Sequence, residues 1–282
     1  MIKILLNKDV TDRINSFPHL IDTNKRLVSK IHDPLLITTS AKSAFRIVAE
    51  KYVLQRSDEV FISTTSDSTF VSSCVTSTFF NYSGVSRELT NRTKLIVIIH
   101  EFGFINPNTE DLILSGMKAG IPVIEDKAHF IDLEARSSLV GDFTIHSIPK
   151  SFPVMKGGLL IDHNKVIDNN NISNRYLCSD FDIHSLNFDF LQQVNERRKY
   201  LYGLYQSLLN VEEIFTISDN DVPFCFGFIP NINIEKFEHE ISPYVELLRN
   251  HVDGQILIPL NPFFKDEEHL VLIKKIEQLN NE

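Results

Sequence analysis

Short apolar runs alternate with helical stretches through the first two-thirds of the chain. The runs that predict strands cover residues 35–39, 59–63, 94–100, 121–125, 143–148 and 157–161. Several of them are nearly continuous in apolar residues, which is typical of strands buried on both faces of a parallel sheet. Helices are expected between the strands, at about residues 41–54 and 69–80, and from Asn106–Thr109 to Gly120. The repeated order of strand, helix and strand predicts an α/β fold with a mainly parallel sheet between helices.

The pattern changes after about residue 162. Residues 164–174 are polar and rich in asparagine, which indicates a loop or linker. The elements expected beyond it are helices at about 184–209, 234–248 and 266–279, and strands at 223–228 and 255–259. Residues 223–228 alternate aromatic and small side chains, as a half-buried antiparallel strand does. We therefore expect a large α/β domain over residues 1–165 and a small α+β domain over residues 166–282.

Composition narrows the function classes. The chain has 282 residues, with 37 acidic and 28 basic side chains and a formal charge of −9, so we expect no nucleic-acid partner. No run approaches the roughly 18 apolar residues of a membrane span. The three cysteines are far apart, without CxxC, and predict neither a disulfide framework nor a metal site; Cys74 is expected to be buried in a helix. The interpretation is a cytoplasmic protein that does not bind membranes.

Two segments contain candidate chemistry. No glycine-rich GxGxxG or Walker pattern occurs. In residues 120–129, Gly-Ile-Pro-Val-Ile-Glu-Asp-Lys-Ala-His, Asp126 lies at the carboxyl end of a predicted strand, where open α/β sheets bind their ligands. In residues 141–158, Ser147 and Lys150 follow another strand, and the pair Gly157–Gly158 comes seven positions after the lysine.

These segments resemble the DegT/StrS family of sugar aminotransferases, which depend on pyridoxal 5'-phosphate (PLP) and have the fold type I architecture of aspartate aminotransferase. The family's G(I/L)PVIEDxA(H/Q) segment is similar to residues 120–129, and its lysine segment is similar to residues 150–158. Weaker matches follow in the family's order, at residues 39–44, 68–73, 100–103, 196–198, 222–223 and 256–260. The resemblance extends over roughly residues 35–280.

The resemblance implies a role for each matched residue. Lys150 would form the Schiff base with the cofactor aldehyde and move protons at the substrate carbon. Asp126 would be the anion beside the pyridine nitrogen. The phosphate would be bound by the backbone N–H groups of Ala41 and Lys42 at a helix start and by the Ser147 hydroxyl. The reaction implied is transfer of an amino group from an amino acid, with glutamate expected, to a keto sugar nucleotide.

Two further residues are implied by the same resemblance. Phe70 would stack on the cofactor ring and His129 would lie near the ring or its phenolic oxygen. The family also implies a homodimer and, most often, a role in cell-surface polysaccharide synthesis. His100, at the end of an apolar strand, is instead expected to satisfy a backbone group.

Each assignment has an ordinary structural alternative. Lys150 could be a solvated loop lysine, with Lys156 as its rival for the catalytic role. Asp126 could cap a helix, and Ser147 could be an ordinary strand-end hydroxyl. His129 could be a core or surface histidine, and Phe70 could simply pack in the core.

A second function class also stays open. The segment before the first matching helix is short, no Gly-x-Asn-Tyr-Arg-like stretch follows the lysine segment, and Lys156 replaces an acidic residue before Gly-Gly. These departures favour the alternative that the chain retains a PLP-type scaffold and acts as a binding or regulatory partner without catalysis.

Overall fold

The computed structural model describes residues 35–66, 73–131, 139–152, 154–178, 188–248 and 254–281. These residues form two compact units. Of the described residues, the large unit holds 35–101, 105–152, 154–178 and 188, and the small unit holds 102–104 and the residues from 189 onward. No helix in the described part of the chain is long and apolar enough to cross a membrane.

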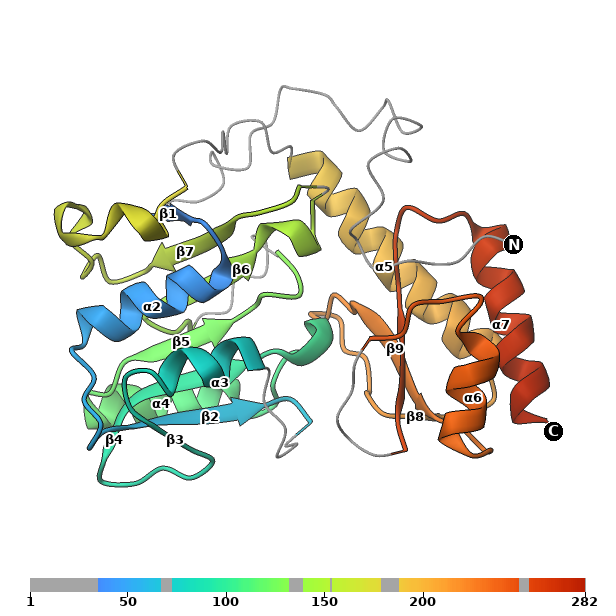
Figure 1. The fold of residues 1–282 in the computed structure, drawn as a ribbon, viewed down its shortest axis with the longest axis horizontal. Helices are drawn as coiled ribbons and strands as arrows, with labels where there is room; N and C mark the ends of the chain where they lie inside the picture. Colours follow the sequence, from blue (N-terminus) through green and yellow to red (C-terminus); the bar gives the residue numbers. More distant parts are fainter. Residues whose placement is uncertain are drawn as a thin grey trace. The chain divides into compact units, whose positions relative to one another are not determined.

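Seven strands form the sheet of the large unit within the described residues (Figure 1). Its strands are β1 (Leu35–Thr38), β2 (Glu59–Thr64), β3 (Gly84–Ser86), β4 (Thr93–Ile99), β5 (Val123–Asp126), β6 (Phe143–Ser147) and β7 (Gly158–Asp162). Their order across the sheet is β1-β7-β6-β5-β4-β2-β3. The pairs from β6 through to β3 are parallel, and β7 is antiparallel to both of its neighbours. The sheet is thus mainly parallel, as the apolar runs predict.

Helices cover both faces of this sheet. On one face, α2 (Ala41–Lys51) and α3 (Ser73–Phe79) pack against Leu95, Val97 and Ile99 of β4. On the other face, α4 (Thr109–Ala119) packs against Ile96 and Ile98 of the same strand. These are the α2 face and the α4 face of the sheet. Successive side chains of a strand point to opposite faces. Because helices cover both faces of β4, this strand can be apolar at nearly every position. On α3, Cys74 is exposed, so the expectation that it is buried is wrong.

The chain continues in the large unit beyond the expected boundary at residue 165. Residues 176–178 lie along the free edge of β1, where the Thr39 N–H donates to Tyr176 O (2.8 Å) and the Cys178 N–H donates to Ile37 O (3.1 Å). Backbone groups on an open strand edge gain hydrogen-bond partners in this way. The break between the units therefore comes at residue 188.

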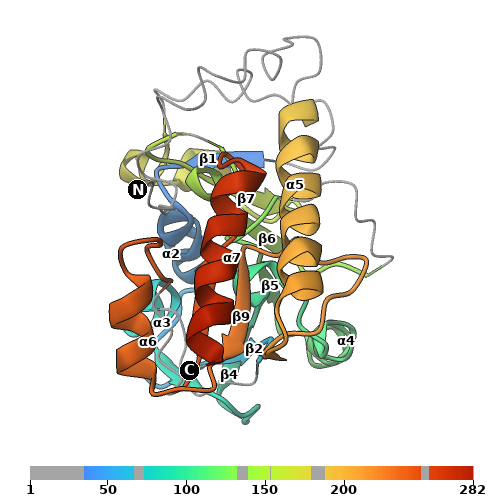
Figure 2. The ribbon, with the colours of Figure 1, turned by 90° about the vertical axis from the view of Figure 1, so that its right-hand side faces the viewer.

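The small unit contains three strands and three helices among the described residues. They are α5 (Phe188–Leu208), which begins at the last residue of the large unit, β8 (Glu212–Glu213), β9 (Cys225–Ile229), α6 (Ile234–Ile241), β10 (Ile256–Pro259) and α7 (Asp266–Asn280). The antiparallel sheet has the order β10-β9-β8. Helices α5 and α7 lie alongside each other (Figure 2), joined by a hydrogen bond between the Tyr205 hydroxyl and His269 Nδ1 (3.0 Å).

Residues 102–104 belong to the small unit although only His100 and Glu101 separate them from β4. The Phe104 ring stacks on Phe215 with the ring centroids 4.4 Å apart. Gly103 has φ +87°, and a Cβ built on it would lie 1.9 Å from Val222 O. Only glycine permits this approach without moving the backbone.

Candidate active site

Strand alternation sorts the polar side chains at the carboxyl ends of β5 and β6. Asp126 follows Ile124 on the α2 face, and Ser147 follows Ile145 on the same face. Asp126 pairs in register with Ile145 on the neighbouring strand. Glu125 follows Val123 and therefore points to the α4 face. Asp126 and Ser147, two of the residues predicted for the cofactor, thus share the α2 face.

Asp126 is a buried carboxylate at the end of a central strand. Asp126 is only 5% exposed, and its Oδ1 accepts a hydrogen bond from the Ala128 N–H (2.9 Å). No other hydrogen bond to this carboxylate is made by the residues that the structure describes. Burial raises the pKa of Asp126 to about 6, against the lowering effects of the Ala128 N–H and of the positive charge of Lys150. The carboxylate can therefore accept a further N–H donor.

Lys150 is the cation that acts on Asp126. It ends a 3-10 turn, Ile148–Lys150, that starts directly after β6, and it is half-buried. Its rival Lys156 is exposed and does not contribute to the pKa of Asp126. The charge of Lys150 therefore acts on Asp126, and the roles of both residues toward a cofactor stay predictions.

The start of α2 lies beside the paired glycines. Ser40 caps the helix, and its side chain accepts from the Ser43 N–H. The N–H groups of Ala41 and Lys42 occupy the first two helical positions, where the helix itself offers no acceptor. The Lys42 ammonium donates to Ser77 Oγ on α3 (3.1 Å).

Gly158 explains why the glycine pair follows the lysine. A Cβ built on Gly158 would lie 2.5 Å from Ala41 N and 2.7 Å from Thr38 Oγ1. Gly158 also pairs in register with Ser147. The absence of a side chain therefore lets the start of α2 lie against β7, one strand away from the Ser147 hydroxyl.

The remaining predicted residues differ in outcome. His129 lies half-buried in the turn after β5, which is closed by a hydrogen bond from the Phe130 N–H to Lys127 O (3.2 Å). Phe70 lies outside the described residues. His100 satisfies a backbone group as expected, since its Nδ1 accepts from the Asn106 N–H (3.1 Å).

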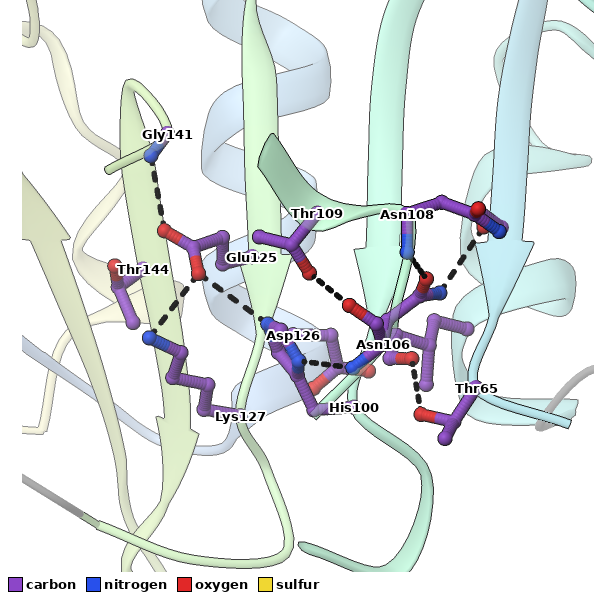
Figure 3. A network of polar contacts seen from close by, with 12 residues as sticks. Thr65, His100, Asn106, Asn108, Thr109, Glu125, Asp126, Lys127, Gly141 and Thr144 are labelled. Carbon is purple, nitrogen blue, oxygen red and sulfur yellow. Dashed lines mark hydrogen bonds and ion pairs between the residues drawn. The ribbon is translucent and has the colours of Figure 1, made fainter. Parts of the chain in front are cut away.

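A buried polar network on the α4 face was not predicted (Figure 3). Glu125 accepts from the Gly141 N–H (2.9 Å) and lies 3.1 Å from Lys127 Nζ and 3.3 Å from His100 Nε2. Asn106 extends the network to Ser63 Oγ (3.0 Å). The signal was available in the sequence, because a glutamate in a buried strand needs partners. Among the described residues, no group of three or more His, Cys, Asp or Glu side chains is arranged to hold a metal ion.

No protein-family model matches the chain. Solved structures do. The PLP form of the putative sugar aminotransferase Spr1654 from Streptococcus pneumoniae matches with a TM-score of 0.71 and 15% identity, over 97% of this chain and 96% of that one. DesV from S. venezuelae matches with a TM-score of 0.72 and 12% identity, over 100% and 99% of the chains.

A third structure is an aminotransferase described as DegT DnrJ EryC1 StrS, from Brucella abortus. It has a TM-score of 0.72 and 10% identity, over 97% of this chain and 96% of that one. Identities this low establish similarity of fold and do not establish activity. The predicted architecture is confirmed: the chain has a mainly parallel sheet between helices and shares the fold of these solved aminotransferase structures.

Proposed function

We propose that this protein is a PLP-dependent aminotransferase that acts on sugars. The observation that carries the proposal is the buried carboxylate of Asp126 at the carboxyl edge of the sheet, whose pKa is lowered by the positive charge of Lys150. The fold shared with sugar aminotransferases supports it. By analogy with these neighbours and with the family motifs, the acceptor is a keto sugar nucleotide, the amino donor is glutamate, and the protein acts as a cytoplasmic homodimer.

The residues on the α2 face fit a phosphorylated pyridine aldehyde. The N–H groups of Ala41 and Lys42 and the Ser147 hydroxyl would be the donors for a phosphate. Asp126 offers an acceptor oxygen for a protonated ring nitrogen. Lys150 supplies the amine. His129 and Phe70 stay predictions for the contacts to the ring.

PLP, when bound, supplies the electron-withdrawing ring that stabilises negative charge at the substrate carbon. The protein's own groups do the remaining work. Lys150 removes a proton from that carbon and returns it to the new position, so it must pass through the neutral amine. Asp126 keeps a proton on the ring nitrogen by remaining ionised beside it. The helix N-terminus and Ser147 bind the phosphate and hold the ring in register with Lys150.

Spectroscopy of purified protein tests the proposal. With added PLP, we expect a visible absorption band that borohydride removes, with the reduced cofactor attached to Lys150 in the peptide mass map. Lys150→Ala should abolish both signals. Lys156→Ala is the matched control and should keep them.

Amino transfer is tested next with the loaded protein. Addition of L-glutamate should release 2-oxoglutarate at no more than one molecule per site in the absence of an acceptor. No band with excess PLP would contradict the proposal and favour the non-catalytic scaffold. A normal band without 2-oxoglutarate release would retain the cofactor and overturn glutamate as donor.

A further inference from the structure

Glu125 and Asp126 are neighbours in sequence, and their side chains point to opposite faces of the sheet. Glu125 is only 2% exposed, and its carboxylate is shared by three donors from three segments of the chain. They are His100 at the end of β4, Lys127 after β5 and Gly141 before β6 (Figure 3). A buried carboxylate with this many partners is held in one position.

The hydrogen-bond pattern determines which ring nitrogen of neutral His100 holds the proton. Its Nδ1 accepts from the Asn106 N–H, so in the neutral ring the proton is on Nε2 and is donated to Glu125 (3.3 Å). Burial alone would raise the pKa of Glu125. The His100 hydrogen bond, the Lys127 charge and the Gly141 N–H together lower it well below the ordinary value, so the carboxylate is ionised at neutral pH.

Backbone hydrogen bonds of His100 and Lys127 fix the chain at Asp126 and directly after it. The His100 N–H donates to Asp126 O (3.0 Å), and the Lys127 N–H donates to Ile145 O on β6 (2.9 Å). The residues on both sides of Asp126, Glu125 and Lys127, are also joined to each other by their ion pair (3.1 Å). Asp126 is thus the central residue of a three-residue segment whose two ends are fixed from the α4 face.

We propose that His100, Glu125 and Lys127 are positioning residues for Asp126, which fix the backbone that directs its carboxylate to the ring nitrogen of the cofactor. The inference rests on the proposed function. It assigns a role to side chains that point away from the cofactor face. A carboxylate displaced by even a fraction of an ångström loses hydrogen-bond strength to a fixed donor.

Two ligands separate this role from a general effect on folding. The first is PLP, and the second is its analogue with C–H in place of the ring nitrogen. Both can bind the phosphate donors and Lys150, but only PLP can use Asp126. We expect Glu125→Gln to weaken PLP binding by about tenfold, since one charged hydrogen bond is lost. Binding of the analogue should change by less than about twofold.

Matched variants complete the experiment. Lys127→Met removes one partner of Glu125, and the Lys127 side chain is itself 14% exposed, so this variant keeps the test available should Glu125→Gln not fold. Tyr176→Phe is the control, because it removes a part-buried hydrogen bond to Glu50 (2.6 Å) in the last turn of α2. It should leave the dissociation constants of both ligands unchanged.

The outcomes are distinct. Selective loss of PLP affinity supports the positioning role. An equal loss of affinity for both ligands, or no loss of affinity for either, overturns the positioning role while leaving the proposed function intact. Failure of the unmodified protein to bind PLP overturns the proposed function, and this inference with it.

Discussion

Replacement of Asp126 by asparagine is expected to stabilise the cofactor-free protein at neutral pH. The carboxyl group is buried, and burial raises its pKa from 3.8 to about 6. In the folded state, therefore, the proton is held more tightly than in the unfolded chain. The contribution of this group to the free energy of unfolding is greatest below about pH 3.8 and falls as the pH rises to about 6.

The magnitude follows from the two pKa values. A shift from 3.8 to about 6 corresponds to about 3 kcal/mol, which is the cost of keeping the carboxylate ionised in the folded protein above pH 6. Asparagine has the same shape, retains an oxygen for the Ala128 N–H and has no charge. The variant should gain up to about 3 kcal/mol at pH 7 and almost nothing at pH 4, while its affinity for PLP falls.

Urea unfolding of the cofactor-free protein and of the Asp126→Asn variant between pH 4 and pH 8 measures this difference in unfolding free energy. The matched control is Glu125→Gln on the adjacent residue, where the sign is reversed. The pKa of Glu125 is lowered by its partners, so its stabilising contribution is present above its ordinary pKa and is lost as the pH falls. Glu125→Gln should therefore destabilise the protein most at neutral pH.

The pH dependence decides whether the reasoning holds. A gain for Asp126→Asn that grows from pH 4 to pH 7 supports it. A variant that is less stable than the unmodified protein at pH 7, or a difference that does not change with pH, would refute the claim that Asp126 is ionised at a cost. The control guards against a general effect of removing charge.

Three other predictions concern packing and pH. Gly158→Ala should lower the unfolding free energy by about 1–3 kcal/mol and weaken PLP binding, because its Cβ would lie 2.5 Å from Ala41 N; chemical unfolding and ligand titration measure the two effects. Phe104→Ala should cost about 3–5 kcal/mol through loss of the stacked ring and the resulting cavity, seen as a lower midpoint in urea. Burial lowers the pKa of His146 from 6.5 to about 4, so stability should fall as the pH drops below 6.5, and His146→Gln should reduce that dependence in unfolding curves at pH 5 and pH 7.

The sequence was most informative where one local pattern determines the result. The nearly unbroken apolar run of β4 predicted a strand covered on both faces, and the structure has helices on each side of it. The sequence also predicted that Asp126 and Ser147 lie at strand ends, and β5 and β6 are neighbouring strands in the structure. Strand order in a parallel sheet then brings such positions together.

Long-range pairing was harder to predict. Residues 176–178 have no strand pattern of their own and gain structure only by bonding to the edge of β1. The alternation in residues 223–228 predicted a half-buried strand, yet Cys225–Phe228 are all buried, since the aromatic side chains of β9 pack against α5 and α6 and side chains from residues 214, 215 and 257 cover Gly227. Neither outcome is encoded by the periodicity of the segment itself.

Glu125 shows why part of the site was missed. Motif comparison directed attention to Asp126, and the adjacent glutamate has the same chemistry with the opposite orientation. Its three donors come from residues 100, 127 and 141, which are brought together only by strand pairing. A search for buried charges in apolar strands would have identified it as a residue that requires partners.

The three residues 102–104 have a consequence for how the protein folds. The small unit needs Phe104 beside Phe215, two rings about 110 residues apart in sequence. During synthesis this tripeptide is made long before the segment against which it packs, so the core of the small unit closes only after a long chain has emerged. Such non-local closure slows folding. A fragment that starts at residue 189 would lack a buried aromatic ring and should be less stable than the same unit in the full chain.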